Sequence, residues 1–72
     1  MSEFKVAREW AIRDEQGNIS YNGFRIAKAR YGFFKVEAYT ADGRVSPVKY
    51  RPGYWNAWDA GLFTLNEMTI DE

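Results

Sequence analysis

Apolar and polar residues alternate most clearly between residues 33 and 40, the pattern of a strand that buries one face. One parity holds Phe34, Val36 and Ala38, and the other holds Phe33, Lys35, Glu37 and Tyr39. Asp42-Gly43 follows and favours the positive φ angles of a tight hairpin turn. The return strand is expected over residues 44–50. Because Pro47 cannot donate to a β-ladder, this strand should be an edge strand or carry a bulge.

Residues 4–13 alternate in the same way, with Arg8 as an interruption. The apolar parity holds Phe4, Val6, Trp10 and Ile12. Residues 15–18 are of turn-forming types, and residues 19–21 then predict a short returning strand. A second hairpin is therefore expected near the N-terminus.

The segment that begins at Asn22-Gly23 has two interpretations. As a tight turn, the dipeptide would make residues 24–30 another strand of an antiparallel meander. As a helix start, Asn22 would be the N-cap and Gly32 would close the helix in the left-handed conformation. We favour the helix, because the segment is rich in alanine, lysine and arginine. As a strand, it would also place two basic side chains on one face with two apolar ones.

Pro52-Gly53 interrupts the chain before an apolar pattern with helical spacing. The recurring residues are Trp55, Trp58, Leu62, Leu65 and Thr69. They predict an amphipathic C-terminal helix that frays over residues 69–72. Gly61 costs about 1 kcal/mol relative to alanine in a helix, so a loop followed by a short strand over residues 63–65 is the alternative.

Together these patterns predict a single α+β domain over residues 1–72. The expected order is ββαββα, in which an antiparallel sheet of two hairpins packs against one or two helices. The alternative is an all-β meander or small barrel with a C-terminal helix.

Composition limits the chemistry of this chain. The 72 residues contain no cysteine and no histidine, so we expect no disulfide, no metal ion and no cofactor. Three Trp, five Tyr and five Phe are more rings than a domain of this size can enclose, because such a domain buries roughly 60% of its unfolded surface. Some rings must be exposed, and exposed aromatic clusters mark contact surfaces.

Catalysis is not expected. Without histidine and cysteine there is no imidazole base and no thiol nucleophile, and the carboxylates form no recognisable pair. The glycines match neither a phosphate-binding loop nor a dinucleotide-binding motif. No window approaches the ~18 apolar residues of a membrane span, and no leader pattern is visible, so the expected location is cytoplasmic.

The favoured function is contact with a protein partner, self-association included. Residues 50–58 concentrate the residue types of interface hot spots. The candidates are Tyr50, Arg51, Tyr54, Trp55 and Trp58. A short, cysteine-free, aromatic-rich chain is also a format common among accessory proteins of phages and mobile elements that inhibit or adapt a host factor.

The alternative function is single-stranded nucleic-acid binding. The net charge is zero, but residues 24–54 hold seven basic and two acidic side chains, whereas residues 55–72 hold four acidic and no basic ones. Cations that follow phosphates, interleaved with rings that stack on bases, are typical of single-strand grooves. The candidates are Arg25, Lys28, Arg30, Lys35 and Lys49.

Overall fold

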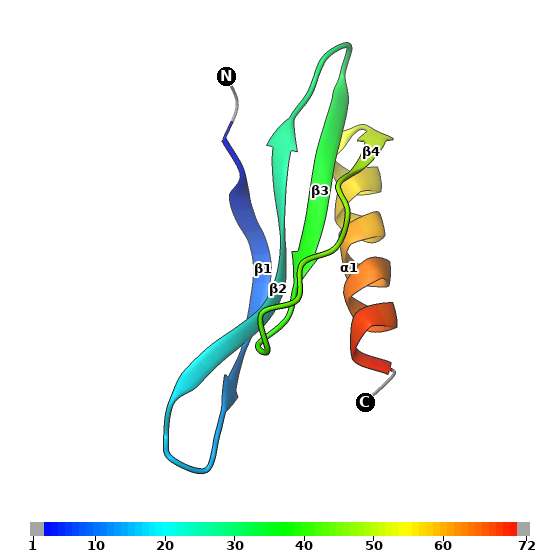
Figure 1. Ribbon diagram of the computed structural model, residues 1–72. Helices are drawn as coiled ribbons and strands as arrows, with labels where there is room; N and C mark the ends of the chain where they lie inside the picture. The colour runs from blue at the N-terminus through cyan, green and yellow to red at the C-terminus, as the bar shows by residue number, and fades with distance from the viewer. Residues whose placement is uncertain (1–2, 71–72) are drawn as a thin grey trace.

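The computed structural model describes residues 3–70, which form four strands followed by one helix (Figure 1). The elements are β1 (Lys5–Arg13), β2 (Ile19–Lys28), β3 (Phe33–Tyr39), β4 (Lys49–Pro52) and α1 (Tyr54–Ile70). The strands pair in chain order as an antiparallel meander, and α1 packs across β2, β3 and β4. We call the side of the sheet that α1 covers the helix face and the other side the open face.

The predicted antiparallel sheet and C-terminal helix are confirmed, but the helix expected between Asn22 and Gly32 is wrong. This segment belongs to β2, which gives the order ββββα. Phe24 and Ile26 are buried on the helix face. The charge conflict that argued against a strand does not arise, because Lys28 is exposed at the last residue of β2 and Arg30 lies beyond it in a turn.

Gly23 serves strand packing and does not form a turn. It lies in the middle of β2 and pairs with Glu9 on one side and with Tyr39 on the other. A Cβ at this position would lie 2.7 Å from the Arg8 carbonyl oxygen and 2.8 Å from the Tyr39 hydroxyl. The glycine therefore lets neighbouring groups occupy space that any side chain would fill.

The expected single apolar face of the N-terminal strand is also wrong, because β1 carries a bulge. Its register against β2 shifts between Val6 and Arg8. One extra residue in a strand reverses the faces of the residues that follow it. Val6 therefore lies on the open face, opposite Arg25, whereas Trp10 lies on the helix face and packs against the core.

The Asp42-Gly43 turn is confirmed, but the return strand is interrupted. Gly43 has a φ of 94° and donates its backbone N–H to the Thr40 carbonyl at 3.0 Å. A single bridge joins Tyr39 to Val45, and regular pairing resumes only at Lys49. Pro47 lies in the gap between them, and β4 is the edge strand that this proline predicts.

The core forms where α1 meets the centre of the helix face. Phe24 and Val36 are fully buried there, and Trp58 packs edge-to-face on Phe24 with ring centroids 5.2 Å apart. The helix comes this close because residue 61 is glycine. A Cβ on Gly61 would lie 2.5 Å from Phe24 Cδ2 and 2.9 Å from Val36 Cγ2.

Helix α1 extends further than expected. It continues through Thr69 to Ile70, and residues 71–72, where fraying was also predicted, lie outside the described residues. Within residues 3–70, no helix is long and apolar enough to span a membrane.

Replacing Gly61 with alanine tests this close approach. Alanine favours an exposed helix by about 1 kcal/mol over glycine, but here its methyl group must displace Phe24 or the helix. We expect Gly61→Ala to lower the free energy of unfolding by about 1–2 kcal/mol in urea denaturation. Asn66→Ala, at an exposed position of the same helix, is the control and should not destabilise the protein. A Gly61→Ala variant as stable as Asn66→Ala would contradict the packing.

Candidate nucleic-acid interface

The centre of the open face is a network of hydrogen-bonded and ionic contacts that crosses β1, β2 and β3. The Tyr39 hydroxyl donates to Glu9 Oε2 at 2.8 Å. The Arg25 guanidinium lies 4.8 Å from the Tyr39 ring centroid, and its Nε is 2.8 Å from Glu37 Oε1. Arg25 and Glu37 balance each other, whereas the Glu9 carboxylate is hydrogen-bonded to a neutral phenol, so this network has no excess positive charge and carries one net negative charge.

Tyr39 reaches Glu9 across Gly23, which carries no side chain to block it. Partial burial, followed by the hydrogen bond to the Glu9 carboxylate, raises the pKa of Tyr39 from 10.0 to about 12. The phenol therefore remains a hydrogen-bond donor throughout the neutral range.

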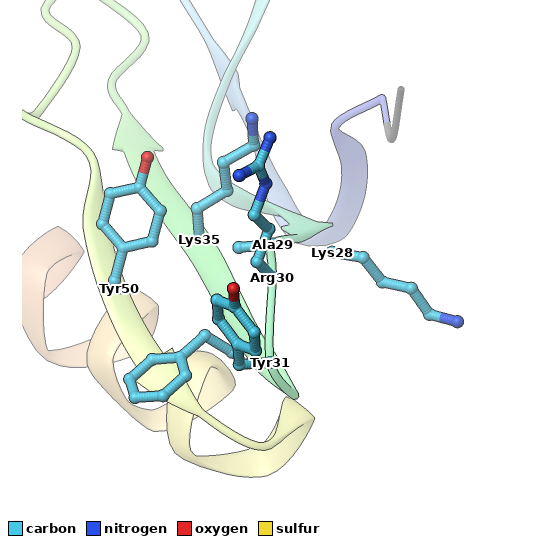
Figure 2. Close-up of a pocket in the computed structure, with 7 residues that line it drawn as sticks. Lys28, Ala29, Arg30, Tyr31, Lys35 and Tyr50 are labelled. Atoms are coloured by element: carbon cyan, nitrogen blue, oxygen red, sulfur yellow. The ribbon is translucent and has the colours of Figure 1, made fainter.

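The end of the open face beside the turn between β2 and β3 differs in chemistry from the centre of this face. A cleft of about 720 Å³ opens beside the turn between β2 and β3 (Figure 2). Its lining residues are Lys28, Ala29, Arg30, Tyr31, Phe33, Lys35 and Tyr50. We call it the basic–aromatic cleft, because these residues include three cations, three rings and no carboxylate.

The turn at this end is built in an unusual way. Tyr31 and Gly32 have φ angles of 58° and 75°, as a two-residue hairpin turn requires. The Phe33 N–H donates to the Arg30 carbonyl at 3.1 Å, and the Ala29 N–H donates to the Phe33 carbonyl at 2.8 Å. Asparagine, aspartate or glycine would be favoured at position 31, whereas a bulky residue is an outlier in the left-handed region. The Tyr31 ring is nevertheless 92% exposed, so packing does not explain its presence.

Neighbouring strands carry the rest of the cleft. Lys35 of β3 pairs with Tyr50 of β4, so both side chains lie on the open face. Lys35 Nζ also lies 5.3 Å from the centroid of the Phe4 ring. In Figure 2, Arg30 and Lys35 extend in the same direction beside the rings of Tyr31 and Tyr50, whereas Lys28 points away from them.

This arrangement is suited to a flexible polyanion with planar groups. Tyr31, Phe33 and Tyr50 are exposed by 92%, 41% and 55%, so their rings are available for stacking. The cations beside them can bind phosphate oxygens. The two carboxylates at the centre of the open face have contacts of their own. Glu9 accepts a hydrogen bond from the Tyr39 hydroxyl, and Glu37 forms an ion pair with Arg25.

The structure does not bring the five basic candidates together. Arg30 and Lys35 meet at the basic–aromatic cleft, whereas Lys28 lines its margin and points away from them. Arg25 is on the same face but paired with Glu37. Lys49 is on the helix face, where its Nζ donates to Thr64 Oγ1 at 2.8 Å.

The structure brings together three of the five residues proposed for protein contact: the ring centroids of Tyr54 and Trp55 lie 5.1 Å apart and those of Trp55 and Trp58 lie 6.2 Å apart. Tyr50 lies in the basic–aromatic cleft, and Trp58 packs on the core. The exposed Arg51 donates from Nη1 to the carbonyl of the preceding residue at 2.7 Å. Tyr54 packs edge-to-face on Phe34, and Trp55 lies beyond it with 71% of its surface exposed.

The sequence places Tyr31 and Phe33 in segments that could form a nucleic-acid surface, but these two rings were not among the named candidates. The signal that could have found Tyr31 is the Tyr31-Gly32 dipeptide between two strand patterns, where glycine indicates a hairpin turn and a tyrosine is out of place. Phe33 could have been found from its parity, because it shares a face with Lys35.

No family model, curated protein or solved structure matches this chain. Within residues 3–70, no group of histidine, cysteine, aspartate and glutamate side chains could hold a metal ion.

The Tyr39 network predicts a difference in alkaline stability. Because folding raises the pKa of Tyr39 from 10.0 to about 12, its contribution to stability is complete below pH 10 and is lost as the pH rises towards 12. We expect the stability of the native sequence to fall more steeply over this interval than that of Tyr39→Phe, measured by urea unfolding. Tyr21→Phe, which removes a hydroxyl from the same face but leaves the Glu9 bond intact, is the control. Equal slopes for the native sequence and Tyr39→Phe would contradict the shift.

Proposed function

We propose that this protein binds single-stranded nucleic acid in the basic–aromatic cleft. The observation that carries the proposal is the gathering of two cations, Arg30 and Lys35, with three exposed rings and no carboxylate at one end of the open face. Phosphates would contact the Arg30 and Lys35 side chains, and bases would stack on the rings of Tyr31 and Tyr50.

A single strand fits this surface better than a duplex. Stacking on a ring requires an unpaired base face, which a duplex hides between its base pairs. The zero net charge also argues against a wide electrostatic footprint, since proteins that follow duplex phosphates usually carry a basic excess. Affinity is therefore expected to arise from a few local contacts.

The backbone of Tyr31 supports a role for its ring. A bulky side chain in the left-handed region costs stability relative to asparagine, and exposure leaves it without compensating contacts within the chain. Such a residue is retained most simply where its side chain contacts a ligand.

The cleft predicts separable effects on binding and stability. With a labelled oligonucleotide of about 10 residues, Arg30→Gln and Lys35→Gln should each weaken binding and flatten the slope of log K against log salt by about 0.7. Tyr31→Asn should weaken binding about 10-fold while leaving the thermal midpoint unchanged or higher. Fluorescence anisotropy and thermal unfolding measure the two effects.

The matched control is Lys49→Gln, which removes one positive charge from the helix face. It should leave both the affinity and the salt slope near those of the native protein. Salt-independent binding, or equal losses in Lys49→Gln and Lys35→Gln, would contradict the proposal.

Contact with a protein partner is the second candidate, and the outer side of α1 favours it. Trp55, Phe63 and Ile70 are exposed there, two helical turns apart from one another. Isolated exposed apolar residues are common, but a line of three with a tryptophan at its end is typical of a contact surface. This surface is separate from the basic–aromatic cleft, so both candidates could hold for one chain. The phage accessory role stays a prediction under this candidate.

Two tryptophan variants test the helix surface. Trp55→Ala should leave the thermal midpoint nearly unchanged, because the ring is largely exposed, and should abolish capture of any nuclease-resistant protein partner. Trp58→Ala should lower the free energy of unfolding by about 3 kcal/mol, because its ring packs on Phe24. Partner capture that survives Trp55→Ala would exclude this surface.

A further inference from the structure

The outer edge of β1 is free along its whole length. β1 is the terminal strand of the sheet, and no described residue pairs with its outer side. The β1–β2 hairpin also extends beyond the end of β3, as Figure 1 shows, because β2 pairs with β3 only from Gly23 onward. An unprotected strand edge is a template for pairing with another strand.

Apolar side chains accompany this free edge. Trp10 and Ile12 lie on the helix face of β1, at the margin of the area that α1 covers. Ile12 is exposed and Trp10 is half-buried. A strand placed beside β1 would shield both side chains and would satisfy the unpaired backbone groups.

A second copy of this chain could pair with the edge in few registers. Facing residues of an antiparallel pair point to the same side of the sheet, so a two-fold symmetric pair must be centred on one residue that faces itself. Centring on Glu9 makes that carboxylate face itself and makes Lys5 face Arg13. It also draws the bulge between Val6 and Arg8 into the pairing.

Two neighbouring registers are no better. Centring on Trp10 makes Glu9 face Ala11, and its one facing pair of opposite charges, Lys5 and Glu15, lies beyond the bulge and beyond the end of β1. Centring on Ile12 makes Glu9 face Glu15. Like charges directly opposite one another destabilise a pair of strands.

Centring on Ala11 brings two different pairs of opposite charges together. Glu9 then faces Arg13 of the second copy on the open face, and Arg8 faces Asp14, which follows the last residue of β1 and whose carboxylate also accepts hydrogen bonds from the Gln16 and Asn18 backbone N–H groups. Trp10 faces Ile12 of the second copy between them. Because of the symmetry, each of these contacts occurs twice. The paired segment, residues 8–14, also begins just after the bulge.

We propose that two copies associate through β1, antiparallel and centred on Ala11, to form one continuous eight-stranded sheet. Arg13 is exposed and has no ion pair among the described residues. Glu9 uses Oε2 for Tyr39 and keeps Oε1 for a partner. The two open faces would lie on the same side of the dimer, with one basic–aromatic cleft near each end. The dimer does not depend on what that cleft binds.

Complementary charge reversals test both the dimer and its register. Glu9→Lys alone would place a lysine opposite Arg13, and Arg13→Glu alone would place a second carboxylate opposite Glu9, so each should weaken dimerisation about 10-fold or more. In an equimolar mixture of the two variants, both facing pairs regain opposite signs. Sedimentation equilibrium should show monomers for each variant alone, and native mass spectrometry should show heterodimers in the mixture.

Two further variants control this experiment. Lys5→Glu reverses a charge on β1 outside the paired segment, so its dimer should match that of the native sequence. Ala11→Lys leaves the Glu9 hydrogen bond intact and places two lysines opposite each other on the symmetry axis, so it should also weaken the dimer. A native protein that stays monomeric at high concentration would overturn the proposal. Charge-reversed variants that dimerise like the native chain, or a mixture that restores no heterodimer, would overturn it as well.

Discussion

The contact between Gly61 of α1 and Phe24 of β2 is the constraint on which the rest of the structure depends. Without a Cβ at residue 61, the helix backbone lies directly on Phe24 and Val36, and Trp58 closes over Phe24 from the same helix. This contact fixes which face of the sheet is buried and sets α1 over β2, β3 and β4. It thereby leaves the opposite face and the outer edge of β1 without a cover from the described part of the chain.

The uncovered face is divided into regions with different chemistry. Its centre carries no excess positive charge, since Arg25 is paired with Glu37 and Glu9 accepts a hydrogen bond from the neutral Tyr39 hydroxyl. The end beside the β2–β3 turn carries unbalanced positive charge together with exposed rings. A chain with zero net charge can therefore hold a local site for a polyanion, because the acidic Asp59 and Glu67 belong to α1 on the other side of the sheet.

The local sequence pattern predicted the elements in which apolar residues recur at a regular spacing. Alternation over residues 33–39, the turn at Asp42-Gly43 and the helical spacing after Gly53 all correspond to observed elements. The prediction was wrong over β2, where the helix-forming residue types favoured a helix. The segment is a strand whose last residue, Lys28, is exposed to solvent and therefore buries no charge. The local pattern could not bring Tyr50 beside Lys35 either, because that neighbourhood depends on the long-range register of β3 and β4.

Two glycines show the same limit of local pattern. Within a sequence, a glycine indicates a turn or a weak point in a helix, because both follow from its own backbone freedom. Gly23 and Gly61 instead serve close packing, against Tyr39 and Phe24 respectively. Those neighbours come from distant parts of the chain, so this role is visible only once the sheet and helix are assembled.

We propose that the basic–aromatic end of the open face binds a single strand of nucleic acid. Mapping of backbone amides by nuclear magnetic resonance shows directly whether the strand binds there. A short single-stranded oligonucleotide is titrated into labelled protein, and shifts in amide position are followed along the chain. We expect saturable shifts concentrated at residues 28–35 and at Tyr50, with the outer side of α1 unaffected. Shifts confined to α1 around Trp55, or none at concentrations that saturate known single-strand binders, would contradict the proposal.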